Sequence, residues 1–266
     1  MRVAVAGAAG RIGRVVHSGL ADRGHDVLAL DAATSDGVHQ LDVRDTVALS
    51  PLLAGCDAVV HLASVADETS FETALDTHLR VTHSVLEAMR SARVPRLVYA
   101  SSNHAVGFTP RADRVSVDTR PRPDTFYGVG KAACEALCSL YVDRYELQIA
   151  CLRIGSFDEI PQSRRHLSTW LSPADAVRLV EACLTAPRLT YAVVYGISAN
   201  TAGWWDLEPG RELGYHPEDD ADVYAERILA IPETDDDRFD ALHVGGDFCR
   251  PSAPVDGRTP PRRLHS

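Results

Sequence analysis

The feature that most constrains the fold is a glycine-rich segment directly after the first apolar run. Residues 2–6 (RVAVA) suit a buried strand, and residues 7–13 read GAAGRIG before a helical stretch begins. Gly7 permits a tight turn at the end of the strand, and Gly13 allows the next helix to pack closely against it. The chain therefore opens with a strand, a tight turn and a helix.

The first half of the chain then alternates short apolar runs with helical stretches. We expect strands at 2–6, 26–31, 58–62, 96–101 and 147–154, helices at 10–23, 71–92 and 125–145, and a short turn at 46–53. Strands alternating with helices predict βαβ units and a parallel sheet. The expected fold class is α/β, a Rossmann-like doubly wound parallel sheet with a small C-terminal substrate-binding portion.

The pattern loosens after Ile154, where we expect substrate-side segments from about residue 155 rather than a second domain. One helix, 173–185, has a coherent start, with Ser172 as N-cap, Pro173 at its first position and Asp175 in its first turn. We predict one domain over 1–249 and a flexible tail over 250–266, which is rich in Pro, Arg and Ser.

Composition excludes several classes of protein. The net charge of -10 argues against nucleic-acid binding, and no apolar run approaches the roughly 18 residues that span a bilayer. The start lacks a signal-peptide layout, and the six cysteines form no CxxC pair, so we expect free, mostly buried thiols and a cytoplasmic protein. The dispersed histidines suggest no metal cluster.

The glycine-rich turn also predicts a dinucleotide site. Gly7, Gly10, Arg11, Ile12 and Gly13 would place a diphosphate at the amino end of the first helix, where free N–H groups and the dipole favour an anion. Asp31, which ends the second strand, would accept hydrogen bonds from the adenosine ribose and repel a 2′-phosphate. No Arg or Lys follows at once, so NAD is favoured over NADP. Asp42, followed by Val43, would contact the adenine, or Asp42 would cap the next helix.

A second set of residues predicts the chemistry. Ser102 precedes Tyr127, and Lys131 follows four residues after Tyr127, so the last two share a helix face. An ammonium there would lower the pKa of the phenol by favouring its charged form. The set predicts that Tyr127 takes a proton from a substrate oxygen held by Ser102.

Together these motifs resemble the extended short-chain dehydrogenases/reductases (epimerase/dehydratase-like), and more closely the bacterial uronate dehydrogenases. The resemblance covers about residues 1–250. It rests on the glycine segment, 61–63 (HLA), 100–107 (ASSNHAVG), 127–131 (YGVGK), 152–156 (LRIGS), 167–170 (LSTW) and 198–206 (SANTAGWWD).

The resemblance implies NAD-dependent oxidation of D-galacturonate or D-glucuronate at C1 to an aldarolactone, and a homodimer or higher homo-oligomer. Tyr127 would be the base, Lys131 would hold the nicotinamide ribose and Ser102 would orient the C1 hydroxyl. Further cofactor contacts would come from Leu62 and Ala63. The residues implied to face the sugar are Ala66, Asn103, His104, Ser156 and Arg165, of which Arg165 would grip the carboxylate.

Three positions depart from the family pattern. Ala66 stands where a substrate-facing serine is usual, His78 where a structural asparagine is usual, and segment 157–162 (FDEIPQ) is unusually acidic. The alternatives are therefore a neutral-sugar (aldose) dehydrogenase, a nucleotide-sugar epimerase or dehydratase, and a non-catalytic NAD-binding protein of the same fold.

Overall fold

The structure is a computed structural model that describes residues 1–112 and 114–250. Within them, the central sheet has seven strands, all paired in parallel. In spatial order these are β3 (His39–Gln40), β2 (Asp26–Asp31), β1 (Arg2–Ala6), β4 (Ala58–His61), β5 (Arg96–Ser102), β6 (Gln148–Ile154) and β9 (Tyr191–Gly196). The predicted doubly wound sheet is confirmed. β3, β9 and the small pair β7 (Ser156–Phe157) and β8 (Trp170–Leu171) were not predicted.

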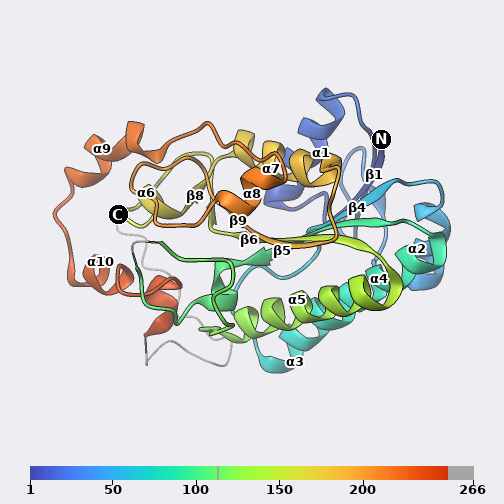
Figure 1. The fold of residues 1–266 in the computed structure, drawn as a ribbon, viewed down its shortest axis with the longest axis horizontal. Helices are drawn as coiled ribbons and strands as arrows, with labels where there is room; N and C mark the ends of the chain where they lie inside the picture. The colour runs from blue at the N-terminus through green and yellow to red at the C-terminus, as the bar shows by residue number, and fades with distance from the viewer. Residues whose placement is uncertain (113, 251–266) are drawn as a thin grey trace.

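Helices cover both faces of the sheet (Figure 1). On one face, α1 (Arg11–Asp22) and α7 (Pro173–Thr185) pack on an apolar cluster that includes Val16, Leu20 and Leu179. On the other lie α2 (Thr46–Leu53), α4 (Val81–Ala92) and α5 (Phe126–Tyr145), around a second cluster. Burial on both faces explains why the strands read as continuous apolar runs rather than alternating ones.

The long predicted helix at 71–92 is interrupted. It consists of α3 (Phe71–Ala74), the π-helix η1 (Leu75–Arg80) and α4. The turn expected at 46–53 is wrong: this segment is the helix α2, because Asp45 caps its start by accepting the Ala48 N–H at 3.0 Å. The helix predicted at 173–185 is confirmed with its Ser172 cap.

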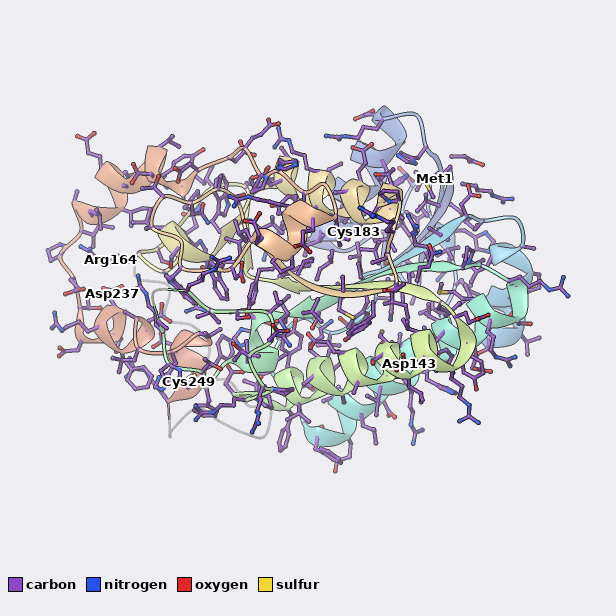
Figure 2. All side chains as sticks on the ribbon, in the orientation of Figure 1. Met1, Asp143, Arg164, Cys183, Asp237 and Cys249 are labelled. Atoms are coloured by element: carbon purple, nitrogen blue, oxygen red, sulfur yellow. The ribbon has the colours of Figure 1, made fainter. Side chains whose placement is uncertain are left out.

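The segments around the site outside the main sheet are short helices joined by loops, and α6, α9 and α10 lie at the end of the molecule opposite the N-terminus (Figure 1). They are η2 (Asn103–Val106), α6 (His166–Thr169), α8 (Glu208–Glu212), η3 (Ala221–Tyr224), α9 (Ala225–Leu229), α10 (Asp235–Asp240) and η4 (Gly246–Cys249). Figure 2 shows the labelled Arg164, Asp237 and Cys249 at this end. Apart from Arg250, the tail predicted at 250–266 lies outside the described residues.

No helix in the described ranges has the length and apolar content that a membrane span requires. All six cysteines are buried and free, as the sequence predicts.

Candidate active site

The carboxyl ends of the parallel strands form a row of three neighbouring cavities. The order of the sheet changes direction between β1 and β4, and ligands of such sheets bind beyond the strand ends at this switch point. We call the cavities the first pocket (about 400 Å³, beside β1 and β2), the catalytic pocket (about 290 Å³, beside β5) and the outer pocket (about 410 Å³, beside α10).

The first pocket and the catalytic pocket meet at the glycine turn. Gly7 has φ +88°, and a Cβ there would lie 2.6 Å from the Ala63 backbone nitrogen. A Cβ at Gly13 would overlap the Gly7 carbonyl, so both positions need glycine. Helix α1 starts at Gly10 with no side-chain cap and no acidic residue in its first turn, which leaves its positive end free for an anion.

Asp31 closes the far side of the first pocket. Its Oδ2 accepts the Ala9 N–H and its Oδ1 accepts the Ala33 N–H, each at 2.9 Å, so the carboxylate has a fixed orientation. Asp42 does not cap α2; it pairs with Arg44 at 2.5 Å, and the hydrogen bond from Arg44 holds the Asp42 pKa below its usual value. Arg44, which the sequence reasoning missed, also lines this pocket.

The predicted cofactor residues are divided between these two pockets. The first pocket is lined by Gly7, Gly10, Asp31, Asp42, Val43, Leu62 and Ala63, and the catalytic pocket by Arg11, Ile12, Gly13, Leu62, Tyr127 and Lys131. Uncapped N–H groups at one end and an oriented carboxylate at the other fit the diphosphate and ribose of a dinucleotide.

Tyr127 and Lys131 reach the catalytic pocket because they lie one turn apart near the start of α5. The Thr125 hydroxyl accepts a hydrogen bond from the Gly128 N–H, and the Glu68 carboxylate accepts hydrogen bonds from the N–H groups of Phe126 and Tyr127. These three backbone N–H groups in the first turn of α5 therefore all have partners. Ser102, at the end of β5, also lines this pocket.

The electrostatics of the pair differ from the sequence prediction. Burial raises the Tyr127 pKa to about 12, while a hydrogen bond with Ser102 lowers it only in part. Lys131 does not offset this, because its Nζ donates to the Ala100 carbonyl (2.6 Å) and the Ser64 hydroxyl (3.0 Å) and lies 5.5 Å from the Tyr127 ring centroid. Burial lowers the Lys131 pKa to about 8.

His78 packs beneath this pair. Its ring meets the Tyr127 ring edge to face at 5.2 Å, and the π-helix η1 carries it into the core. Neither ring nitrogen has a hydrogen-bond partner among the described residues, and burial lowers its pKa to about 3. His78 is therefore neutral at physiological pH.

The outer pocket opens from the catalytic pocket at His104 and Gly155. It brings together the predicted Asn103, His104, Ser156 and Arg165, whereas Ala66 lines the catalytic pocket. Ser156 Oγ shares a hydrogen bond with Thr169 Oγ1 at 2.9 Å. Asn103 is buried and donates to the Val244 carbonyl at 3.2 Å.

Arg165 is nearly buried at the wall of the outer pocket. It donates to the Val244 carbonyl at 2.5 Å, lies 3.8 Å from the Asp240 carboxylate, and has a pKa lowered by burial. Asp158 also lines the pocket but pairs with Arg11 at 3.3 Å, whereas Glu159 is exposed.

Sequence reasoning missed the wall of the outer pocket that α10 and η4 form, which is lined by Asp236, Asp237, Asp240, Gly245, Asp247 and Phe248. No motif marks these residues, because they reach the site only through the path of α10 and η4. Ser64 was also missed, although it directly follows a segment of the resemblance. Among the described residues, no group of side chains could hold a metal ion.

Comparisons with known proteins show the family of the chain. The model of the NAD dependent epimerase/dehydratase family matches residues 3–158. The chain is 39% identical to the uronate dehydrogenase of Agrobacterium fabrum, covering 93% of this chain and 96% of that protein. It is 36% identical to the L-arabinose 1-dehydrogenase (NAD(P)(+)) of Haloferax volcanii, covering 85% and 99%. A solved mutant of the Agrobacterium tumefaciens uronate dehydrogenase, complexed with NAD, superposes with a TM-score of 0.87 at 37% identity over 93% and 96% of the chains.

Proposed function

The chain belongs to the uronate dehydrogenases of the NAD-dependent epimerase/dehydratase family, and we propose that it oxidises a hexuronate, D-galacturonate or D-glucuronate, at C1 to an aldarolactone. It is an NAD-dependent oxidoreductase that acts on a CH–OH group. The observation that carries the choice of substrate is the position of Arg165. Its largely buried side chain lines the outer pocket, which opens from the pocket that holds Tyr127 and Lys131.

The first two pockets fit NAD. The open start of α1 would hold the diphosphate, Asp31 the adenosine ribose, and Lys131 the nicotinamide ribose. When bound, the cofactor supplies the acceptor for the hydride that leaves C1.

Tyr127 Oη would take the proton of the C1 hydroxyl, and Ser102 would orient that hydroxyl. Because the Tyr127 pKa is about 12 in this structure, the phenolate alone is scarce at neutral pH. Only the phenolate can accept the C1 hydroxyl proton, so Tyr127 must first lose its own proton, and burial makes that loss costly. Lys131, with a pKa of about 8, is mostly charged at neutral pH. Together with the positively charged nicotinamide of bound NAD, it would favour ionisation of Tyr127.

Sugar recognition would follow from the outer pocket. A guanidinium donates two parallel hydrogen bonds to a carboxylate, so Arg165 would select a uronate over a neutral sugar. Ser156 and Asn103 would contribute side-chain polar groups at the same wall, while Ala66 leaves space where a hydroxyl is usual. Asp158 is partly neutralised by Arg11 and weakens this preference little.

An aldose dehydrogenase is the second candidate, and one observation favours it. Arg165 already has the Val244 carbonyl and the Asp240 carboxylate beside it, and Asp240 is one of four aspartates that line the wall formed by α10 and η4. A neutral sugar would meet no repulsion there. Two of these aspartates, Asp236 and Asp247, are paired with Arg250, which reduces the negative charge that a uronate meets.

Location and assembly are further proposals. Six buried free thiols suit the reducing cytoplasm. Val129, Leu140 and Tyr145 on α5 are exposed apolar residues, which suits a homodimer formed through this helix.

The test is a panel of galacturonate, glucuronate, galactose, glucose, xylose and arabinose, with NAD reduction followed by absorbance. We expect uronate-selective turnover that is abolished in Tyr127→Phe.

Arg165→Met should lower kcat/KM for uronates at least about tenfold, through KM, because it removes a charge-assisted bidentate contact. Arg164→Met is the matched control, since Arg164 donates to the Leu229 and Ile231 carbonyls and lines none of the three pockets. Turnover of neutral sugars only would assign the protein as an aldose dehydrogenase, and tight NAD binding without turnover would leave a binding protein.

A further inference from the structure

A buried carboxylate, Asp124, lies three residues before Tyr127 and has no assigned role. Its side chain has no exposed surface, and it lies at the junction of η2, α5 and η4. Its Oδ2 is 2.8 Å from His104 Nδ1, and its Oδ1 accepts the Thr125 hydroxyl at 3.0 Å. The Cys249 thiol approaches Oδ2 at 4.0 Å. Every one of these neighbours can donate a hydrogen bond, as an ionised carboxylate requires.

The backbone makes room for this carboxylate on two sides. A Cβ added at Gly107 or at Gly245 would overlap the Asp124 carboxylate. Gly245 N–H donates to the Gly107 carbonyl at 2.8 Å, so the two glycines come from segments that are bonded directly to each other. The segment after η2 and the segment before η4 therefore close around Asp124, and no larger residue fits at either glycine without displacing it.

This arrangement determines which ring nitrogen of His104 carries the hydrogen in the neutral ring. A carboxylate accepts but does not donate, so Nδ1 must carry the hydrogen that lies between them. In the neutral ring the other nitrogen, Nε2, is then an acceptor. Nε2 has no hydrogen-bond partner within the described residues, and His104 lines both the catalytic and the outer pocket.

We propose that Asp124 is a positioning residue that holds His104 as the Nδ1–H tautomer, so that Nε2 accepts a hydrogen bond from a hydroxyl of the bound sugar. This inference rests on the proposed function for the identity of the ligand. It divides the recognition of a uronate between two unlike groups: an acceptor, His104, for a hydroxyl and a donor, Arg165, for the carboxylate. The edge-on contacts of the His104 ring with Tyr127 (5.8 Å) and Phe248 (4.7 Å) fix its plane.

Asp124→Asn is the informative variant because it keeps the shape and removes the charge. The asparagine amide can donate to Nδ1, and His104 then becomes the Nε2–H tautomer, which presents a donor where the sugar needs an acceptor. We expect kcat/KM for the preferred sugar to fall about 10- to 100-fold, mainly through KM, as for other partners that orient a histidine. The NAD dissociation constant and the melting temperature should change little.

A double-mutant cycle separates this role from a structural one. If Asp124 acts through His104, Asp124→Asn should cost less than about threefold in the His104→Ala background. An undiminished loss in that background would overturn the proposal. Cys249→Ala is the matched control, because it removes another neighbour of the same carboxylate without touching His104, and its kcat/KM should stay within about threefold of the wild type.

The tautomer of His104 can also be measured on the wild-type protein, without kinetics and without replacing Asp124. Long-range ¹H–¹⁵N correlation on histidine-labelled wild-type protein, with His104 assigned through His104→Gln, should show a protonated Nδ1 and a bare Nε2. A protonated Nε2 would refute the proposal. Because this measurement uses no sugar, it remains decisive even if the wild type oxidises no uronate, which would refute the proposed function alone.

Discussion

Replacing His78 by asparagine should make the stability of the protein less sensitive to acid, by an amount that follows from its burial. The His78 ring is 1% exposed, neither nitrogen has a partner in the described residues, and burial lowers its pKa from 6.5 to about 3. The unfolded chain therefore binds a proton on His78 below about pH 6.5, while the folded protein does not until about pH 3. Stability contributed by the neutral ring is complete above pH 6.5 and is lost progressively as the pH falls toward 3.

The magnitude follows from proton linkage, which gives about 1.4 kcal/mol for each pH unit between the two pKa values. At pH 5, about 1.5 units below the unfolded value, His78 should destabilise the fold by about 2 kcal/mol relative to pH 7.5. His61, which is also buried and whose pKa is also lowered to about 3, should add a similar loss. Together they remove roughly 4 kcal/mol, a large part of the 5–15 kcal/mol that stabilises a typical protein.

The assay is urea unfolding followed by circular dichroism at pH 7.5 and pH 5 for the wild type and His78→Asn. The substitution leaves a smaller side chain and so lowers the free energy of unfolding at both pH values, but that loss cancels in the difference between them. We expect the pH-dependent loss to be about 2 kcal/mol smaller in the variant.

The matched control is His39→Asn, at an exposed position on β3. It shows how replacing histidine by asparagine changes the pH-dependent loss of stability when the imidazole is already in water. If His78→Asn and His39→Asn change the pH-dependent loss equally, the reasoning from burial is refuted.

Two further predictions concern the cofactor and the packing beneath the base. Asp31→Ser should reduce the preference for NAD over NADP at least about tenfold, measured as the ratio of the two kcat/KM values. The substitution removes the carboxylate that repels a 2′-phosphate and leaves Arg44 in the same pocket. An unchanged ratio would show that Asp31 does not set the choice of cofactor. Gly130→Ala should lower the free energy of unfolding by about 1–3 kcal/mol and reduce kcat. The alanine Cβ would lie 2.8 Å from His78 Cδ2 and push the imidazole ring against Tyr127. An active variant of wild-type stability would show that the His78 ring can move freely.

The sheet and the start of the site could be predicted because their signals are local. The apolar run at 2–6, the glycines that follow it and the Asp31 position all lie within one βαβ unit, and the structure places them as one strand-end site. The pair Tyr127 and Lys131 follows from helix periodicity alone. Each of these predictions needed only the spacing of residues in one segment.

The electrostatics and the outer pocket could not be predicted in this way. The sequence predicts that Lys131 lowers the Tyr127 pKa, but the ammonium is directed at the Ala100 carbonyl and Ser64, and burial of the phenol dominates. Desolvation and the choice of hydrogen-bond partner are tertiary properties, so no motif encodes them. The π-helix that turns His78 toward Tyr127 also leaves no sequence signature that we could identify.

The acidic wall of the outer pocket shows why the substrate is harder to infer than the reaction. Tyr127, Lys131 and Ser102 are held by the sheet and by α5. Two residues of the outer pocket, Asn103 and Arg165, instead donate hydrogen bonds to the same backbone carbonyl, that of Val244. We therefore expect a change in the path of residues 235–249 to move Arg165 and the acidic wall together while leaving Tyr127 in place.

It follows that preference for a uronate or a neutral sugar can shift through the C-terminal segment without any change in the chemistry. The chain is similar both to a protein named uronate dehydrogenase and to one named L-arabinose 1-dehydrogenase, at 39% and 36% identity. This separation also gives Asp124 its importance, because this carboxylate lies where the segment that carries the base and the segment that ends the sugar site close on each other. We expect a residue at that junction to transmit a change in the C-terminal segment to His104, and so to alter which sugar hydroxyl His104 would bind.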